Sequence, residues 1–147
     1  MVPILMPYPS FFKEDDASVI LRAKIITEMK KPIPGLTVSV HSGGAQNDRN
    51  VSVVVAQAAD ELLTMNDIHV SAVLNESDDG VSISARSDGS VNVQTMMEEL
   101  GGGGHQTVAG VQLDNKRAVD IMPQIISLAK KQLEEIITMK VILLSRY

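Results

Sequence analysis

A run of four glycines followed by a histidine is the feature of this sequence best suited to chemistry. The run is Gly101 to Gly104, and His105 follows it directly. One glycine with positive φ is enough to end a helix, and each further glycine costs about 1 kcal/mol of conformational entropy. Without Cβ atoms, successive backbone N–H groups can also line a nest for phosphate oxygens. The run alone leaves a phosphate loop and a structural turn equally open. No Lys-Ser/Thr pair follows it, so it is not a P-loop.

Two side chains near this run could act on the same ligand. His105 could donate a hydrogen bond to an oxyanion or stack on a base, or it could simply bond a backbone carbonyl. Arg86 is the only basic residue among residues 51–100, which hold nine acidic residues. Its guanidinium suits a phosphate clamp, and the alternative is an exposed salt bridge of little energetic weight. Ser84 lies two residues earlier on the same strand face and could add a hydroxyl donor.

Composition and charge exclude several classes of protein. The chain has 147 residues, enough for one domain, with a net charge of −5 and no cysteine. Disulfide frameworks and thiolate metal sites are therefore excluded. The acidic middle of the chain rules out a general basic surface for duplex nucleic acid, so a phosphate must be held by a local device. No apolar stretch reaches the ~20 residues of a membrane span and no signal peptide is visible, so a cytoplasmic location is expected.

The pattern of elements predicts a single α/β domain with a mixed sheet flanked by helices. Residues 1–35 are expected to form an N-terminal arm and a connecting helix, capped at Asp15 or Ser18 and ending near Lys31 at the prolines. Residues 36–137 are expected to form the domain. The structure of residues 138–147 is left open between a strand, a helix extension and a tail. Strands are predicted at 36–41, 51–55, 68–75, 81–87 and 107–113, and helices at 56–65, 92–100 and 116–137.

The segment 83–110 resembles the C-terminal, substrate-binding domain of the DHH family of phosphoesterases. The resemblance rests on Gly102-Gly103-Gly104-His105, on Val108-Ala109-Gly110, where the family usually has Ala-Ala-Gly, and on Ser84-Ala-Arg86-Ser87. The valine at 108 is a departure that would narrow the floor of the pocket. Residues 56–65 and the Asn92-Val-Gln segment are most similar to the cyclic-di-AMP phosphodiesterase branch.

This resemblance implies a function and a set of contacts. The chain would be the nucleotide- and phosphate-binding half of a metal-dependent phosphodiesterase acting on a cyclic or short dinucleotide. The expected substrate contacts are Gly102, Gly103, Gly104, His105, Arg86, Ser84 and Asn92. An alternative from the same family is a nucleic-acid-binding domain of an exonuclease or oligoribonuclease that grips single-stranded ends. The charge pattern discriminates between the two, because a strand-binding channel needs several basic residues.

The catalytic metals of the family are expected outside these residues. In the family, Asp-His-His and related motifs of a separate domain hold two manganese ions, and this sequence has no Asp-His-His. His41 and His69 lack the neighbours of a two-metal site and are expected on the surface or in packing. No catalytic residue, metal or other cofactor is therefore assigned here, and the isolated chain is expected to be inactive. The expected partners are a cyclic dinucleotide or short oligonucleotide, the metal-binding domain of the parent protein and, as an open option, a second copy. This segment is expected to make no membrane contact, although the branch resemblance implies a parent protein anchored upstream.

Overall fold

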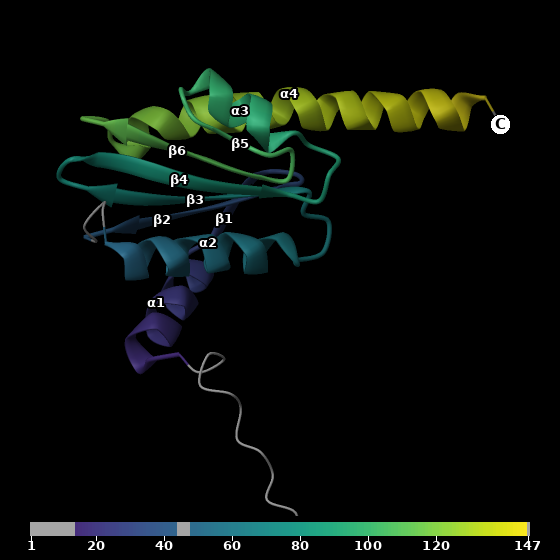
Figure 1. The fold of residues 1–147 in the computed structure, drawn as a ribbon. Coiled ribbons are helices and arrows are strands. Elements are labelled where there is room, and N and C mark those ends of the chain that lie inside the picture. Colours follow the sequence, from purple (N-terminus) through teal and green to yellow (C-terminus); the bar gives the residue numbers. More distant parts are fainter. Residues whose placement is uncertain (1–13, 44–47, 147) are drawn as a thin grey trace, which may run out of the picture.

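The computed structural model describes residues 14–43 and 48–146. Within these ranges the chain forms four helices and a six-stranded sheet (Figure 1). The helices are α1 (Asp16–Thr27), α2 (Arg49–Leu63), α3 (Val93–Glu99) and α4 (Ala118–Ser145). The strands are β1 (Lys30–Ile33), β2 (Leu36–Ser42), β3 (Val70–Ser77), β4 (Gly80–Ser87), β5 (Gly103–Gly104) and β6 (Val108–Asp114).

The sheet is mixed and is covered by helices on both faces. Its strand order is β1-β2-β3-β4-β6-β5, with β2 and β3 parallel and the other neighbours antiparallel. α1 and α2 lie on one face, and α3 and α4 lie on the other (Figure 1). This arrangement confirms the predicted single α/β domain.

Alternation along the strands divides the core into two parts. On β3, Val70, Ala72 and Leu74 pack toward α3 and α4, whereas Val73 packs against α2. On β4, Val81, Ile83 and Ala85 belong to the α3/α4 side. Ser82, Ser84 and Arg86 therefore share the α2 face, as the sequence pattern predicts.

The predicted strand at residues 51–55 is wrong, because these residues form the first turns of α2. Asp48 caps this helix, its side chain accepting a hydrogen bond from the Asn50 N–H at 2.9 Å. The buried positions of α2 repeat at helical spacing through the β-branched run and beyond it: Val54, Val55, Ala58, Ala59 and Leu62. Burial of one helix face thus overrides the strand propensity of valine.

The first helix also ends earlier than predicted. α1 begins after the Asp15 cap, as expected, but it stops at Thr27 rather than near Lys31. Lys30–Ile33 instead forms edge strand β1, which pairs with β2. A proline is tolerated in an edge strand, because its missing N–H can face away from the sheet. The N-terminal arm predicted to precede this helix lies outside the described residues.

At the other end of the chain, α4 continues well past the predicted end at Ile137. Residues 138–145 extend it to Ser145, so this stretch is helical. The long helix projects beyond the edge of the sheet (Figure 1). Glu76 holds its N-terminus, since its carboxylate accepts from the Ala118 N–H at 2.8 Å and from Arg117 at 3.2 Å.

Candidate functional site

The structure brings most of the sequence-predicted site residues to adjacent strands β4, β6 and β5. Ser84 on β4 pairs with Gly110 on β6, which pairs with Gly103 on β5. Arg86 pairs with Val108 one step further along the same strands. Residues directly opposite one another in neighbouring strands share a face. We call this surface, made of Ser84, Arg86, Val108, Gly110 and Gly103, the glycine strip.

The helices leave part of this face of the sheet open. α2 packs mainly on β3 and β4. Along β6, the residues on the α3/α4 side, Ala109 and Val111, are buried, whereas Val108 on the α2 side is 44% exposed. The glycine strip is therefore accessible to a ligand.

The fold requires glycine at some positions of the run but not at all of them. Gly101 has φ +96° and ends α3. A Cβ on Gly102 would lie 2.2 Å from the Gly110 oxygen, and one on Gly104 would lie 2.5 Å from the Ala109 Cα. Glycine is required at these two positions because the backbone of β6 lies too close for a side chain to fit. By contrast, a Cβ on Gly103 would meet nothing within 4 Å, and its φ lies outside the left-handed region. Nothing in the fold requires glycine at position 103.

Within the glycine strip, Arg86 is held in place by a carboxylate of α2. Its Nε donates to the Asp60 side chain at 2.8 Å, and its Nη1 donates to the Ala85 carbonyl at 3.0 Å. The Arg86 side chain is only 12% exposed, whereas Asp60 is 64% exposed. The salt bridge predicted as the simpler role of Arg86 is thus present, and it also fixes where the guanidinium lies.

His105 lies in the turn that joins β5 to β6. Its backbone N–H donates to the Val108 carbonyl at 2.7 Å, and the residue is exposed. The next residue, Gln106, ties this turn to the end of β4, because its Nε2 donates to the Gly89 carbonyl at 3.3 Å. In strand order, Val108 separates Arg86 from His105, so this departure from the family pattern lies within the site.

Asn92 has a structural role at the start of α3. Its side chain accepts a hydrogen bond from the Thr95 N–H at 3.3 Å and caps the helix. Its backbone N–H donates to Gln132 on α4, and its carbonyl accepts from the same side chain. These bonds join α3 to α4.

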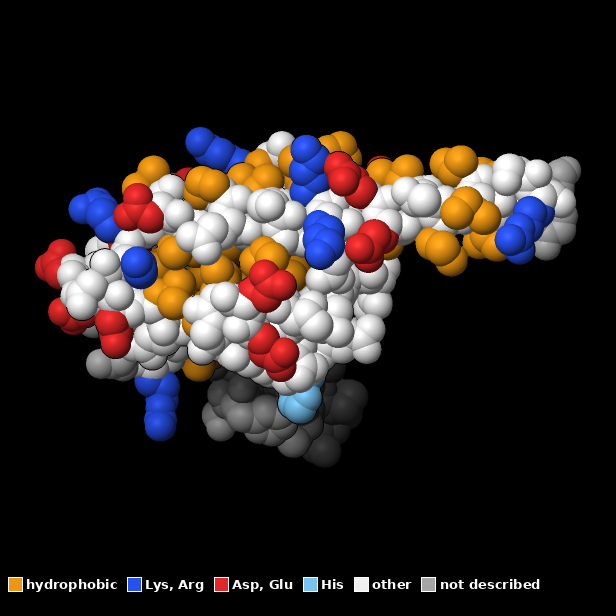
Figure 2. Space-filling view, turned by 90° about the horizontal axis from the view of Figure 1, so that it is seen from above, with side chains coloured by type: hydrophobic (Ala, Val, Ile, Leu, Met, Phe, Trp, Pro, Cys, Tyr) orange, Lys and Arg blue, Asp and Glu red, His pale blue; other side chains and the backbone are white. Residues whose placement is uncertain are grey.

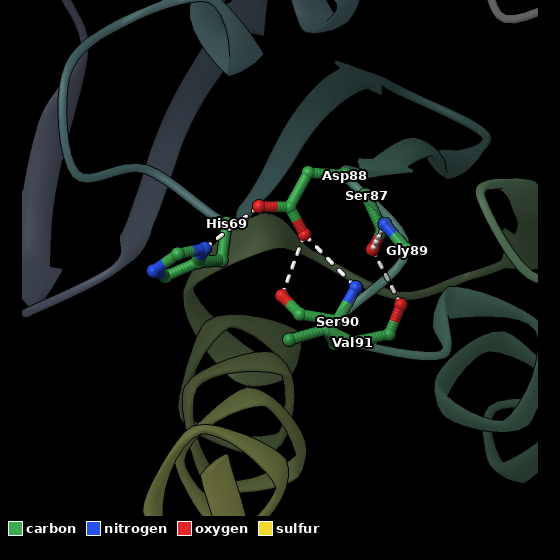
Figure 3. Close-up of polar contacts among 6 residues, drawn as sticks. All are labelled: His69, Ser87, Asp88, Gly89, Ser90 and Val91. Carbon is green, nitrogen blue, oxygen red and sulfur yellow. Dashed lines mark hydrogen bonds and ion pairs between the residues drawn. The ribbon is translucent and has the colours of Figure 1, made fainter. Parts of the chain in front are cut away.

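A polar cluster at the same end of the sheet was missed in the sequence analysis. His69 Nδ1 lies 2.7 Å from Asp88 Oδ2, and the other oxygen of Asp88 accepts from the N–H and hydroxyl of Ser90 (Figure 3). The hydroxyl of Ser87 bonds the Val91 carbonyl across the same turn. Burial raises the pKa of Asp88, but the bonds from Ser90 and His69 outweigh it and hold this pKa below its ordinary value of 3.8. The register of the β3–β4 hairpin predicts this pair. Val70 lies opposite Ser87, so the preceding residue His69 lies opposite Asp88.

The residues described here do not fit a two-metal centre. Residues 14–43 and 48–146 contain no group of three or more His, Cys, Asp or Glu side chains arranged to hold a metal ion. His41 is half-buried, and burial lowers its pKa below 6.5, with Lys24 adding to the effect. A manganese ion would have to be held by residues other than these.

The fold is a single α/β domain, and one face of its sheet carries the accessible glycine strip. The model of the DHHA1 domain family matches residues 36–145. The chain belongs to this family, the domain associated with DHH phosphoesterases.

Relatives and solved structures agree with this assignment. The chain is 42% identical over 104 residues to the cyclic-di-AMP phosphodiesterase GdpP of Geobacillus thermodenitrificans, covering 70% of this chain and 15% of that protein. It is 35% identical over 118 residues to the cyclic-di-AMP phosphodiesterase PdeA of Listeria monocytogenes, covering 80% of this chain and 18% of that protein. A solved structure of an exopolyphosphatase-related protein from Bacteroides fragilis has the same fold, with a TM-score of 0.69 at 17% identity. It covers 81% of this chain and 36% of the other. The chain thus spans less than a fifth of the length of these two phosphodiesterases.

Among the described helices, none is both long and apolar enough to cross a bilayer.

Proposed function

We propose that this chain is the nucleotide- and phosphate-binding part of a metal-dependent phosphodiesterase that hydrolyses a cyclic dinucleotide of the cyclic-di-AMP type or a short dinucleotide. The family assignment and the phosphodiesterase relatives support this substrate class. The catalytic metals would be held by a domain outside the described residues, where they would activate water for attack on phosphorus. The residues described here would bind and orient the substrate.

The single observation that carries the proposal is the glycine at position 103. Gly102 and Gly104 are required by close backbone contacts, but the space above Gly103 is open. A glycine that the fold does not require, on an accessible strip, fits a place where a ligand approaches the backbone closely. The phosphate would lie over Gly103 and Gly110, where no side chain keeps it from the backbone.

Arg86, which belongs to the strip, and His105, in the β5–β6 turn, would complete the contacts. The Arg86 guanidinium is already positioned by Asp60, so it loses little side-chain freedom when it binds phosphate. The negative charge of Asp60 opposes an incoming phosphate, and the two anions would share the guanidinium. The exposed His105 would donate to the phosphate or stack on a base.

Nucleotide titration with a matched pair of arginine variants tests this proposal. Arg86→Lys keeps the charge but loses the planar fork, so we expect the affinity of the chain for cyclic-di-AMP to fall by about tenfold. Arg22→Lys is the control, because Arg22 on α1 also pairs with carboxylates, those of Glu14 and Glu61, and none of these residues belongs to the strip. Equal affinities in the two variants would contradict the role of Arg86.

The length of the ligand separates a dinucleotide site from a strand-binding site. We expect a single-stranded ten-mer to bind no more tightly than the dinucleotide, because the strip has one arginine and that arginine is paired with Asp60. The affinity for the ten-mer should also depend only weakly on the salt concentration. Tight ten-mer binding with a steep salt dependence would favour an exonuclease-type domain instead.

A further inference from the structure

An exposed glutamine lies on the open face of the sheet, next to the glycine strip. Gln112 on β6 pairs with Ser82 on β4, two residues along from the pair formed by Gly110 and Ser84. Side chains two residues apart on a strand point to the same face, so Gln112 shares the face of the strip. It lies about 7 Å from Gly110 along the strand. The side chain of Gln112 is therefore within reach of a ligand bound on the strip.

The fold does not use the carboxamide of Gln112. α2 packs mainly on β3 and β4, and β5 begins at Gly103, which pairs with Gly110 and not with Gln112. The residue is exposed. The carboxamides of Gln106 and Gln132 each bond a backbone carbonyl, whereas that of Gln112 makes no hydrogen bond to the part of the chain that the structure describes. Its donor and its acceptor are both available to a ligand.

The row of residues that ends at Gln112 is polar across three strands. Asn75 on β3 pairs with Ser82, and Ser82 pairs with Gln112. The Asn75 side chain is buried, and neither its amide nitrogen nor its amide oxygen has a hydrogen-bond partner among the described residues. Buried amides are normally hydrogen-bonded. A polar ligand group beside Ser82 thus suits this row better than an apolar one.

The other face of the sheet is not an alternative place for such a group. Figure 2 looks onto the side that α4 covers, where apolar side chains line the hollow beside this helix. Val38, Val40 and Ile126 are among the residues that line it. The hollow lies across the sheet from the glycine strip. A nucleotide whose phosphate is on the strip cannot reach it.

The chemistry of a carboxamide matches one purine better than the other. A glutamine side chain presents one donor and one acceptor side by side. Adenine presents the complementary pair, the N6 amino group and the N7 acceptor, whereas the same edge of guanine presents two acceptors, O6 and N7. A glutamine therefore makes two hydrogen bonds to this edge of adenine and only one to that of guanine.

We propose that Gln112 binds the edge of an adenine base and selects adenine over guanine, at a base subsite on β6 beside the glycine strip. This inference rests on the proposed function, because it needs a phosphate over Gly103 and Gly110. From there the sugar carries the base along β6 toward Gln112. A guanine in the same place leaves a polar group unpaired, and this loss is the source of the selectivity.

Binding of two ligands that differ only in the base tests this inference. The 147-residue chain should bind cyclic-di-AMP about tenfold more tightly than cyclic-di-GMP. Gln112→Leu keeps the approximate size of the side chain but removes both hydrogen bonds, so it should weaken cyclic-di-AMP binding by about tenfold and cyclic-di-GMP binding much less. Gln112→Arg should reverse the preference, because arginine donates to both O6 and N7 of guanine. Gln124→Leu is the matched control, since Gln124 is exposed on α4, and it should bind both ligands as the wild type does.

The outcomes separate this inference from the function on which it rests. A wild-type chain that binds neither ligand would overturn both. A chain that binds the two ligands equally, or whose preference Gln112→Leu leaves unchanged, would overturn the role of Gln112 and leave the proposed function standing. An equal loss of both ligands in Gln112→Leu, at an unchanged melting temperature, would also overturn it, because the residue would then contact a part that the two ligands share.

Discussion

Alanine at positions 102 and 103 should separate what the glycine run does for the fold from what it does for a ligand. A Cβ on Gly102 would lie 2.2 Å from the Gly110 oxygen and 2.5 Å from the Val111 Cβ. Either β6 or the loop must move, and such overpacking costs about 1–3 kcal/mol. For a domain of this size, the melting temperature of Gly102→Ala should fall by roughly 3–10 °C.

Gly103→Ala should behave in the opposite way. Its Cβ would occupy open space, and its backbone conformation is one that alanine adopts. Lower entropy of the unfolded chain should leave stability unchanged or raise it by about 0.4–1 kcal/mol. If phosphate lies against the backbone there, the added methyl group should weaken nucleotide binding by at least about tenfold.

Thermal melting and nucleotide titration of both variants, compared with the wild type, provide the assay. A Gly103→Ala chain that is stable and binds normally would refute the idea that ligand approaches this residue. A destabilised Gly103→Ala chain would refute the inference that a side chain at position 103 has open space around it. In the Gly102→Ala variant, any loss of binding should accompany loss of the folded state.

Three further predictions concern stability. Asn92→Ala should cost about 1 kcal/mol in urea unfolding through loss of the α3 cap, and an unchanged value would contradict the capping role. His41 is kept neutral in the folded state by a lowered pKa, whereas the unfolded chain binds a proton near pH 6.5. The contribution of His41 to the free energy of unfolding is therefore full above pH 6.5 and is lost as the pH falls below that value. In His41→Gln, the free energy of unfolding should depend less on pH below pH 6.5. The pKa of Asp88 is lowered below 3.8, so the stability from its contacts is present above that pH and is lost as the pH falls through the folded pKa. An Asp88→Asn chain that matches the wild type in its acid unfolding would contradict this assignment.

Local patterns in the sequence predict the β3–β4 hairpin and the sheet face on which Ser84 and Arg86 lie. Alternation in β4 places Ser84 and Arg86 on one face, because a strand has a period of two and one of its faces must be buried. The run at 51–55 predicts a strand because four of its five residues are valine, but these valines also fit the first turns of a helix. Only the continued spacing to Leu62, together with the Asp48 cap, distinguishes the two.

Other parts of the site depend on contacts between distant segments. Glycine is required at position 102 because the backbone of Gly110 lies beside it, and the position of Arg86 depends on Asp60 of α2. Neither contact can be read from a local pattern. They follow only once the order of β4, β6 and β5 and the packing of α2 are known.

The two edges of the sheet also limit how the chain can associate with others. One edge is β1, a four-residue strand that contains Pro32 and two lysines, and the other is β5, which is two residues long. Short, charged or proline-containing edges are poor templates for pairing with a strand of another molecule. The sheet is therefore protected against edge-to-edge growth into aggregates.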